Sequence, residues 1–271
     1  MAIKFSRYDE FIEWLKTKYY PHTITQTGAY FKKHLSQRSF RSPQELNRYI
    51  LSKKRGIKNL IVAARVYLNF CEYHEYMTEE AINYYRKYLK IPRGHKDIYV
   101  PSNDEIIKNF EIIKSHKSLR MVYIVLACSG IRYVEALDFL GNYDPKRFRV
   151  HSNYVSYSVG LLRNTKNINN IYLPKFVYEI LHPVTNTYQS LAVKVKEKGA
   201  SVTFKYLRKW NYNFLLYNQV PESVADWIQG RSGKSVSANH YLAKGQQADY
   251  WYEKVADKFH ELFKTVQNRE G

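Results

Sequence analysis

The sequence has very little cysteine: only Cys71 and Cys128 occur among its 271 residues. Two thiols cannot build the disulfide framework of a small secreted domain or a zinc site with four cysteine ligands. The sequence also lacks any run of 18 or more apolar residues, the length that a membrane-crossing helix needs. Its first residues lack the apolar stretch of a secretory signal. We therefore expect a reduced, intracellular, soluble protein with no membrane partner.

Motifs of nucleotide-dependent and metal-dependent chemistry are missing as well. There is no Walker loop and no GxGxxG segment. The nine histidines form no His-x-x-x-His pair on an apolar helix, and paired carboxylates of the nuclease type are missing from apolar strands. A two-metal phosphoryl-transfer site is therefore not expected, and we predict neither a metal nor any other cofactor. Any phosphoryl chemistry has to use arginine, lysine and a side-chain nucleophile.

Positive charge, by contrast, is abundant. The chain holds 43 Lys+Arg against 24 Asp+Glu, which gives a formal net charge of +19. Residues 1–93 hold 18 basic and 8 acidic side chains, and residues 94–271 hold 25 and 16. This charge predicts a polyanionic partner, most often nucleic acid, although basic proteins also bind membrane surfaces. Because both halves share the excess, a single basic tail on a neutral protein does not explain it.

A break in the pattern divides the chain. Pro92 and Gly94 stand among basic residues between two patterned regions, and such a segment is typical of a linker. We predict a helical bundle over 1–91, a basic linker over 92–100 and a second domain over 101–271. The expected fold class is α+β, mainly α, because only one stretch of the second domain has the period of a sheet.

The first domain is expected to be helical throughout, with four or five short helices in a compact bundle. Ser42 and Glu45 have the spacing of a capping box, which marks the start of a helix. Apolar spacing and breaker residues predict further helix boundaries. The clearest predicted helices cover residues 44–51, 58–73 and 78–90.

Basic residues on the surface of this domain and its linker could follow a phosphate backbone. Each of them alone could equally be a solvated side chain, and the run over 53–58 is the strongest group. The candidate DNA-binding residues, of which the last belongs to the second domain, are Lys32, Lys33, Lys53, Lys54, Arg55, Lys58, Arg93, Lys96 and Arg163.

The second domain mixes helices with a small sheet. Ser102 and Glu105 form a second capping box, and Gly130 ends an apolar helix. Residues 148–173 alternate between apolar and polar side chains, which predicts a small antiparallel three-stranded sheet with Lys166 at its hairpin tip. The predicted helices cover residues 121–129, 133–140, 202–217, 222–228 and 249–266.

Candidates for chemistry follow one another in a fixed order. An arginine comes two residues after Gly130, with Glu135 three residues after it. A lysine follows on the predicted hairpin, and two cations then share one face of a helix. Finally, an arginine directly after Gly230 is followed ten residues later by a tyrosine. Each feature is weak alone, because about one residue in six is Lys or Arg and about one in ten is Tyr. Taken singly, each residue could instead be a helix cap, a turn residue or part of the packed core. In order, the candidates are Arg132, Lys166, Lys205, Arg208, Arg231 and Tyr241.

This ordered set resembles the catalytic motif of the tyrosine recombinase (integrase) family. That motif runs through an arginine, a hairpin lysine, a His-or-Lys-x-x-Arg pair, a His or Arg after glycine, and the nucleophilic tyrosine. Lys205 and Arg231 stand where bacterial members usually have histidine, and together with the spacing to Tyr241 they resemble archaeal integrases of the fusellovirus and plasmid kind. The resemblance covers roughly 95–250 and is only architectural over 1–90, where the family has a helical core-binding domain.

The resemblance implies a site-specific recombinase that cleaves and rejoins duplex DNA through a 3′-phosphotyrosyl intermediate, without metal or ATP. Tyr241 would be the nucleophile, Lys166 would protonate the leaving 5′ oxygen, and the remaining candidates would bind the phosphate. Glu135 is expected to orient a cation. A type IB topoisomerase and a catalytically silent DNA-binding module remain alternatives.

The expected partner is double-stranded DNA with specific recombination sites. The resemblance implies a homotetramer on DNA, with a monomer or dimer in the free state, which acts in viral or plasmid genome integration in the host cell cytoplasm at the nucleoid. The apolar C-terminal helix, with Val255, Phe259 and Phe263, either docks on a neighbouring protomer or packs on its own domain.

Overall fold

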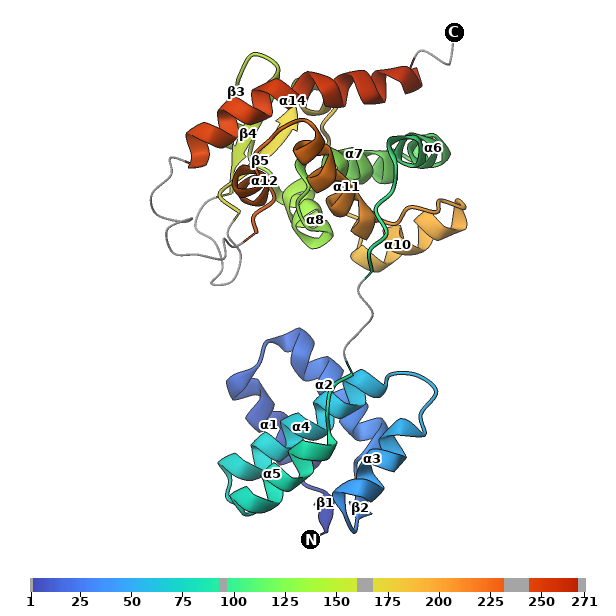
Figure 1. Cartoon of the computed structure of the whole chain (residues 1–271), viewed down its shortest axis with the longest axis vertical. Coiled ribbons are helices and arrows are strands. Elements are labelled where there is room, and N and C mark those ends of the chain that lie inside the picture. Colours follow the sequence, from blue (N-terminus) through green and yellow to red (C-terminus); the bar gives the residue numbers. More distant parts are fainter. Residues whose placement is uncertain (1, 93–96, 160–167, 232–243, 268–271) are drawn as a thin grey trace. The chain divides into compact units, whose positions relative to one another are not determined.

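The computed structural model describes residues 2–92, 97–159, 168–231 and 244–267. The chain divides into two compact units, Met1–Asp97 and Ile98–Gly271 (Figure 1). Five of the candidate residues lie outside the described ranges: Arg93, Lys96, Arg163, Lys166 and Tyr241. None of the described helices is long and apolar enough to cross a membrane.

The first unit contains five helices among its described residues, as predicted. Thr78 caps the last of them by accepting a hydrogen bond from the backbone N–H of Ala81. Ser42 accepts from the backbone N–H of Glu45, but the Glu45 carboxylate accepts from Arg41 and so completes only half of the predicted capping box. The helices are α1 (Tyr8–Lys18), α2 (Pro21–His34), α3 (Pro43–Leu51), α4 (Ile57–Tyr73) and α5 (Glu79–Tyr88).

The prediction that the first unit is entirely helical is wrong. Two short strands, β1 (Ile3–Phe5) and β2 (Arg38–Phe40), pair in an antiparallel ladder. Their inward residues are buried, and the ring of Phe5 packs edge-on against those of Phe31 and Phe40. Strands of three residues are too short to show a period of two, so the helical signal around them dominates the sequence pattern.

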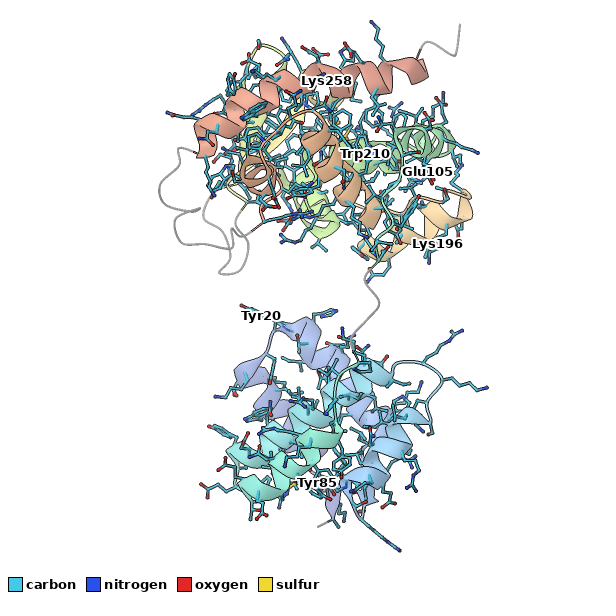
Figure 2. The ribbon with its side chains drawn as sticks, in the orientation of Figure 1. Tyr20, Tyr85, Glu105, Lys196, Trp210 and Lys258 are labelled. Carbon is cyan, nitrogen blue, oxygen red and sulfur yellow. The ribbon has the colours of Figure 1, made fainter. Side chains whose placement is uncertain are left out.

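Several of the 26 tyrosines pack in the cores of the two units. In the first unit, Tyr67 and Tyr85 are buried in the aromatic core, and in the second unit Tyr123 and Tyr252 are buried as well (Figure 2 labels Tyr85). Burial raises the pKa of all four phenols. These four tyrosines are therefore core residues and not candidates for a nucleophile.

The second unit surrounds a small sheet with helices. Ser102 and Glu105 form the predicted capping box at the start of the first helix, with both hydrogen bonds present. The helices in the described ranges are α6 (Asn103–Ile113), α7 (Lys117–Ser129), α8 (Tyr133–Asn142), α9 (Lys175–Glu179), α10 (Tyr188–Glu197), α11 (Phe204–Tyr217), α12 (Glu222–Ile228) and α14 (Lys244–Gln267), with a 3₁₀ turn η1 (Pro145–Arg147).

The predicted antiparallel sheet is confirmed. Its strands β3 (Phe148–Val150), β4 (Tyr154–Ser158) and β5 (Asn170–Pro174) lie in that order. Val155 and Leu173 are paired and buried against the helices, which include α7 and α14. The predicted hairpin tip with Lys166, between β4 and β5, lies outside the described ranges.

The apolar face of α14 packs on its own unit. The helix begins at Lys244, five residues before the predicted 249, and it lies along the sheet (Figure 1). Val255, Phe259 and Phe263 are buried, and the ring of Phe259 stacks on Phe214 with centroids 4.5 Å apart. Of the two alternatives for this helix, packing on its own domain is the one that these contacts support.

Candidate active site

The first candidate arginine follows the end of α7. Gly130 ends this helix in the left-handed region at φ 64°, and its N–H donates to the carbonyl oxygen of Leu126. A Cβ at Gly130 would lie 2.1 Å from Oδ1 of Asn211, so a side chain does not fit there. The chain then turns directly into α8, and Arg132 is the residue that precedes this helix.

Glu135 fixes Arg132 from the first turn of α8. Its carboxylate accepts 2.7 Å hydrogen bonds from the backbone N–H and from Nη1 of Arg132. The side chain of Arg132 is 43% exposed, whereas that of Glu135 is 11% exposed. The prediction that Glu135 orients a cation is confirmed, and the remaining guanidinium donors of Arg132 are accessible to a ligand.

The second arginine follows the end of α12 in a similar way. Gly230 has φ 64° and donates to Trp227, while the N–H of Arg231 donates to the carbonyl oxygen of Asp226. This pair of bonds is a Schellman motif, which favours glycine at the left-handed position. Arg231 therefore leaves the helix in a defined direction, and its guanidinium carbon lies 4.0 Å from the centroid of the Tyr212 ring.

Arg208, on α11, connects these two helix ends. Its Nη1 donates to the carbonyl oxygens of Gly130 and Gln229, both at 2.8 Å. Each carbonyl belongs to the residue two positions before an arginine, Arg132 in one case and Arg231 in the other. Burial and then the charges of Arg132 and Arg231 lower the pKa of Arg208 to about 10. Arg208 thus stays charged at neutral pH, and the three side chains form one arginine cluster: Arg132, Arg208 and Arg231.

Two buried amides support this cluster. Asn211 donates to the carbonyl oxygens of Ala127 and Cys128 at 2.8 and 3.1 Å, which satisfies groups that the end of α7 leaves without helical partners. Its own Oδ1 accepts from Gln229 Nε2 at 2.7 Å. Both amide side chains are fully buried, so each lost bond would leave an unpaired polar group in the core.

Gln229 also contacts two of the arginines directly. Its Nε2 donates to the backbone carbonyl of Arg208 at 3.0 Å, and its Oε1 accepts from Nε of Arg231 at 3.0 Å. Asn211 and Gln229 are not among the candidates that the sequence suggests. The available signal is positional, since Asn211 follows Arg208 by three residues on α11 and Gln229 directly precedes Gly230.

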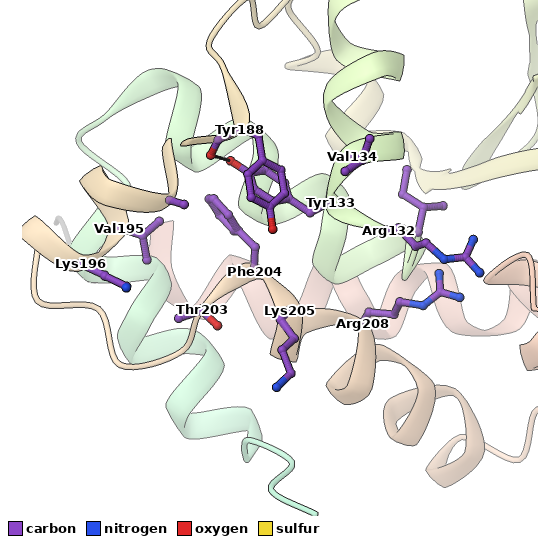
Figure 3. A pocket seen from close by; sticks show the side chains of 12 residues that line it. Arg132, Tyr133, Val134, Tyr188, Val195, Lys196, Thr203, Phe204, Lys205 and Arg208 are labelled. Carbon is purple, nitrogen blue, oxygen red and sulfur yellow. Dashed lines mark hydrogen bonds between the residues drawn. The ribbon is translucent and has the colours of Figure 1, made fainter. Parts of the chain in front are cut away.

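Lys205 does not join the arginine cluster in this structure. It is exposed on α11, and its ammonium lies 4.8 Å from the centroid of the Tyr206 ring. Figure 3 shows Arg132 and Arg208 extending to the same side, with Lys205 extending away from them. The side chains of Lys205 and Arg208, three residues apart on α11, therefore extend in different directions.

A pocket of about 490 Å³ opens beside Arg132, Lys205 and Arg208. Its apolar wall contains Tyr133, whose ring centroid lies 4.4 Å from that of Tyr188 (Figure 3). In Figure 3 the guanidinium groups of Arg132 and Arg208 extend away from the aromatic residues of this pocket. In the described ranges, no three His, Cys, Asp or Glu side chains gather as ligands for a metal ion.

The basic candidates of the first unit lie mostly on its surface. Lys53 is partly buried, with its ammonium 3.8 Å from the centroid of the Tyr49 ring, and Lys32 lies over Tyr8 at 5.6 Å. Their role in DNA binding stays a prediction. The exposed candidates of this unit are Lys32, Lys33, Lys54, Arg55 and Lys58.

The second unit matches a known protein family. The sequence model of the archaeal phage integrase family matches residues 98–258. The chain belongs to the archaeal phage integrase family. The matched range includes every element of this integrase that carries the arginine cluster, and the predicted family resemblance is confirmed. No curated protein matches the chain by sequence.

Solved structures share the fold of this integrase. A lambda integrase tetramer bound to a Holliday junction aligns with a TM-score of 0.62 and 12% identity over 88% of this chain and 76% of that chain. A lambda integrase(75–356) dimer bound to a COC′ core site aligns with a TM-score of 0.60 and 13% identity over 83% of this chain and 94% of that chain. These similarities confirm the predicted fold class, mainly helical with a small antiparallel sheet.

Proposed function

We propose that this integrase is a site-specific DNA recombinase that cleaves and rejoins duplex DNA through a 3′-phosphotyrosyl link to Tyr241. The observation that carries the proposal is the arginine cluster, in which Arg208 holds together the segments that present Arg132 and Arg231. Guanidinium groups match the geometry of phosphate oxygens and remain charged at neutral pH. A preorganised set of such groups suits the non-bridging oxygens of a phosphodiester.

The proposed reaction exchanges one phosphodiester bond for another of similar energy. The phenol of Tyr241 loses its proton to water as its oxygen attacks phosphorus, the bond to the 5′ oxygen breaks, and Lys166 donates a proton to that oxygen and regains one from water. Rejoining runs in reverse, because the 5′ hydroxyl attacks the phosphotyrosine and releases Tyr241. Each cleavage stores the energy of the phosphodiester in the new bond, so the proposed cycle needs no ATP and uses the arginines in place of a metal.

Tyrosines beside the arginine cluster are poorly suited to the nucleophilic role. The hydroxyl of Tyr212 donates to the Glu222 carboxylate at 3.3 Å, and burial, followed by the charge of Asp226, raises its pKa to about 12. The hydroxyl of Tyr133 donates to the carbonyl oxygen of Tyr188 at 3.0 Å, and burial raises its pKa as well. Both phenols are engaged and hard to deprotonate, which supports Tyr241 as the attacking residue.

The proposed substrate is double-stranded DNA with specific recombination sites. We assign Lys205 to the scissile phosphate once DNA is bound. The basic candidates of the first unit are assigned to the phosphate backbone: Lys32, Lys33, Lys53, Lys54, Arg55 and Lys58. The assembly on DNA would be a homotetramer that forms from a monomer or dimer in the host cell cytoplasm. The lambda integrase tetramer on a Holliday junction supports this assembly by its similar fold.

A covalent trap on randomised DNA tests the proposal and identifies the target sequence in the same experiment. The full chain is incubated with a library of duplexes that carry a random core and a nick, so that cleavage releases a short strand and prevents rejoining. Complexes that survive SDS are recovered and their DNA is sequenced. We expect one core sequence to be enriched with the wild-type chain and no covalent complex with Tyr241→Phe.

Two results would contradict the proposal. Covalent complexes that persist with Tyr241→Phe would remove the assigned nucleophile. Recovery without any enriched core, together with relaxation of supercoiled plasmid, would identify a type IB topoisomerase activity in its place.

A further inference from the structure

A second basic site lies at one end of the sheet in the second unit. The strand pairs Phe148↔Tyr157 and Ser158↔Asn170 bring the start of β3, the end of β4 and the start of β5 together. The turn η1 directly precedes β3, so its side chains meet at the same end.

A pocket of about 430 Å³ lies at this end of the sheet. Lys146, Arg147 and Arg149 are exposed there and supply three positive charges. Hydroxyl and amide groups from β4 and β5 complete the wall, and none of the described lining residues is acidic. The lining residues are Lys146, Arg147, Phe148, Arg149, Ser156, Ser158 and Asn170.

The two ends of the sheet differ in charge environment. At the turn between β3 and β4, Ser152 donates to the Glu253 carboxylate at 2.6 Å and Asn153 donates to Asp257 at 2.9 Å. Both carboxylates belong to α14, which therefore covers that end with acidic side chains. Three cations gather at the opposite end, where the Asp144 carboxylate caps η1 by accepting from the backbone N–H of Lys146 at 2.9 Å.

Two of the pocket's cations are carried by the sheet or packed on it. The guanidinium carbon of Arg147 lies 5.2 Å from the centroid of the Tyr157 ring, and Arg149 pairs across the ladder with Ser156. Ser156 is nearly buried and its hydroxyl contacts His151 Nε2 at 3.2 Å. The Arg147 guanidinium is therefore held against an aromatic ring, which lowers the entropy that phosphate binding would cost at this residue.

This end of the sheet lies near one member of the arginine cluster, Arg231. A Cβ built at Gly230 would lie 2.0 Å from Cγ1 of Ile168, so these two residues are in tight contact. Arg231 follows Gly230 directly, and Asn170 of the pocket follows Ile168 by two residues. The segment that leads into β5 at the pocket therefore lies against the residue that precedes Arg231, which supports contact of one duplex with both sites.

We propose that this pocket binds a backbone phosphate of the DNA substrate outside the scissile position, through Arg147, Arg149 and Lys146. The inference rests on the proposed recombinase function, since it adds a second contact to the same duplex. Three cations and a mostly polar wall suit a phosphodiester, and Phe148 is the one aromatic residue among the described lining residues. Contacts of this kind position the duplex and carry no sequence preference.

The test measures DNA affinity against salt concentration. All measurements use the full chain with Tyr241→Phe, so that covalent chemistry does not contribute, and a duplex of fixed sequence. We expect Arg149→Ala to weaken binding about tenfold, the loss typical of one charge-assisted hydrogen bond, and to lower the salt slope by about one. Arg149→Lys should restore the slope, because it keeps the charge.

Matched controls keep the test decisive. Lys258→Ala removes an exposed cation from α14 (Figure 2) and should leave the slope unchanged. An unchanged slope with Arg149→Ala would overturn the inference, as would binding of inorganic phosphate that depends on Arg149 while DNA affinity does not. Failure of the recombinase proposal has a different signature, namely no covalent complex between the wild-type chain and nicked DNA.

Discussion

At the scale of single residues, Arg208 has two tasks at once. Its guanidinium satisfies carbonyl oxygens at the ends of two helices, and its charge adds to those of Arg132 and Arg231. A cation near the C-terminal end of a helix is favoured by the helix dipole, which offsets part of the repulsion within the cluster. Structure and proposed chemistry therefore depend on the same side chain.

Arg208→Lys should damage both tasks. A lysine ammonium cannot reproduce the planar fork that reaches the carbonyls of Gly130 and Gln229 while facing the phosphate. We expect the rate of covalent DNA cleavage to fall roughly 10²- to 10³-fold. The free energy of unfolding should fall by about 1–3 kcal/mol, measured by chemical denaturation. Arg41→Lys, at an exposed site of the first unit, should change neither quantity, and equal rates for both variants would contradict the assignment.

Gly130→Ala should cost more stability than Gly199→Ala. Both glycines have positive φ, 64° and 77°, so alanine meets the same backbone strain of about 1 kcal/mol at each. At Gly199 nothing lies within 4 Å of the added Cβ, whereas at Gly130 it would meet Oδ1 of Asn211 at 2.1 Å. Overpacking should add about 1–3 kcal/mol at Gly130 alone. Equal losses in chemical denaturation would show that the amide network tolerates displacement.

The sequence predicts the arginines of this site but not the amides that hold them. Arg132, Arg208 and Arg231 stand out because their order resembles a family motif and two of them follow helix-ending glycines. Asn211 and Gln229 have no such marker, since an amide on a helix is more often a solvated residue. Only the packing of α7, α11 and α12 shows that these amides bond main-chain groups in the core.

At the scale of elements, the predicted sheet and most helices are found where expected, and the exceptions have local causes. The strands β1 and β2 are missed because three residues give no readable alternation. The early start of α14 is missed because residues 244–247 are polar or glycine and show no apolar period. Tertiary contacts supply what the local pattern lacks, since Lys244 and Ala248 are buried by the rest of the unit.

A pair of substitutions on α14 tests how this helix is used. Phe259 is fully buried against Phe214, and Phe259→Ala should lower the free energy of unfolding of the second unit by about 3–5 kcal/mol. Tyr250 is 54% exposed, so Tyr250→Ala should change it by less than about 1 kcal/mol. Chemical denaturation measures both values. A stable Phe259→Ala chain that fails to assemble on DNA would instead place this face on a neighbouring protomer.

At the scale of the whole molecule, charge and tyrosine content have different meanings. The net charge of +19 is shared by both units, as expected for a protein whose two parts contact one polyanion. The 26 tyrosines are not 26 equal candidates, because several are core residues and the hydroxyl groups of Tyr133 and Tyr212, near the arginine cluster, are engaged. The proposed nucleophile is Tyr241, which lies outside the described residues.

Mass spectrometry of the covalent complex tests most directly whether Tyr241 is the nucleophile. The full chain is trapped on nicked DNA, the DNA and the protein are digested, and the peptide that carries a nucleotide is sequenced. We predict a phosphotyrosyl nucleotide on Tyr241 of the wild-type chain, attached through the 3′ phosphate. A nucleotide on Tyr212, Tyr133 or any other residue, or cleaved DNA without a protein adduct, would contradict the central claim.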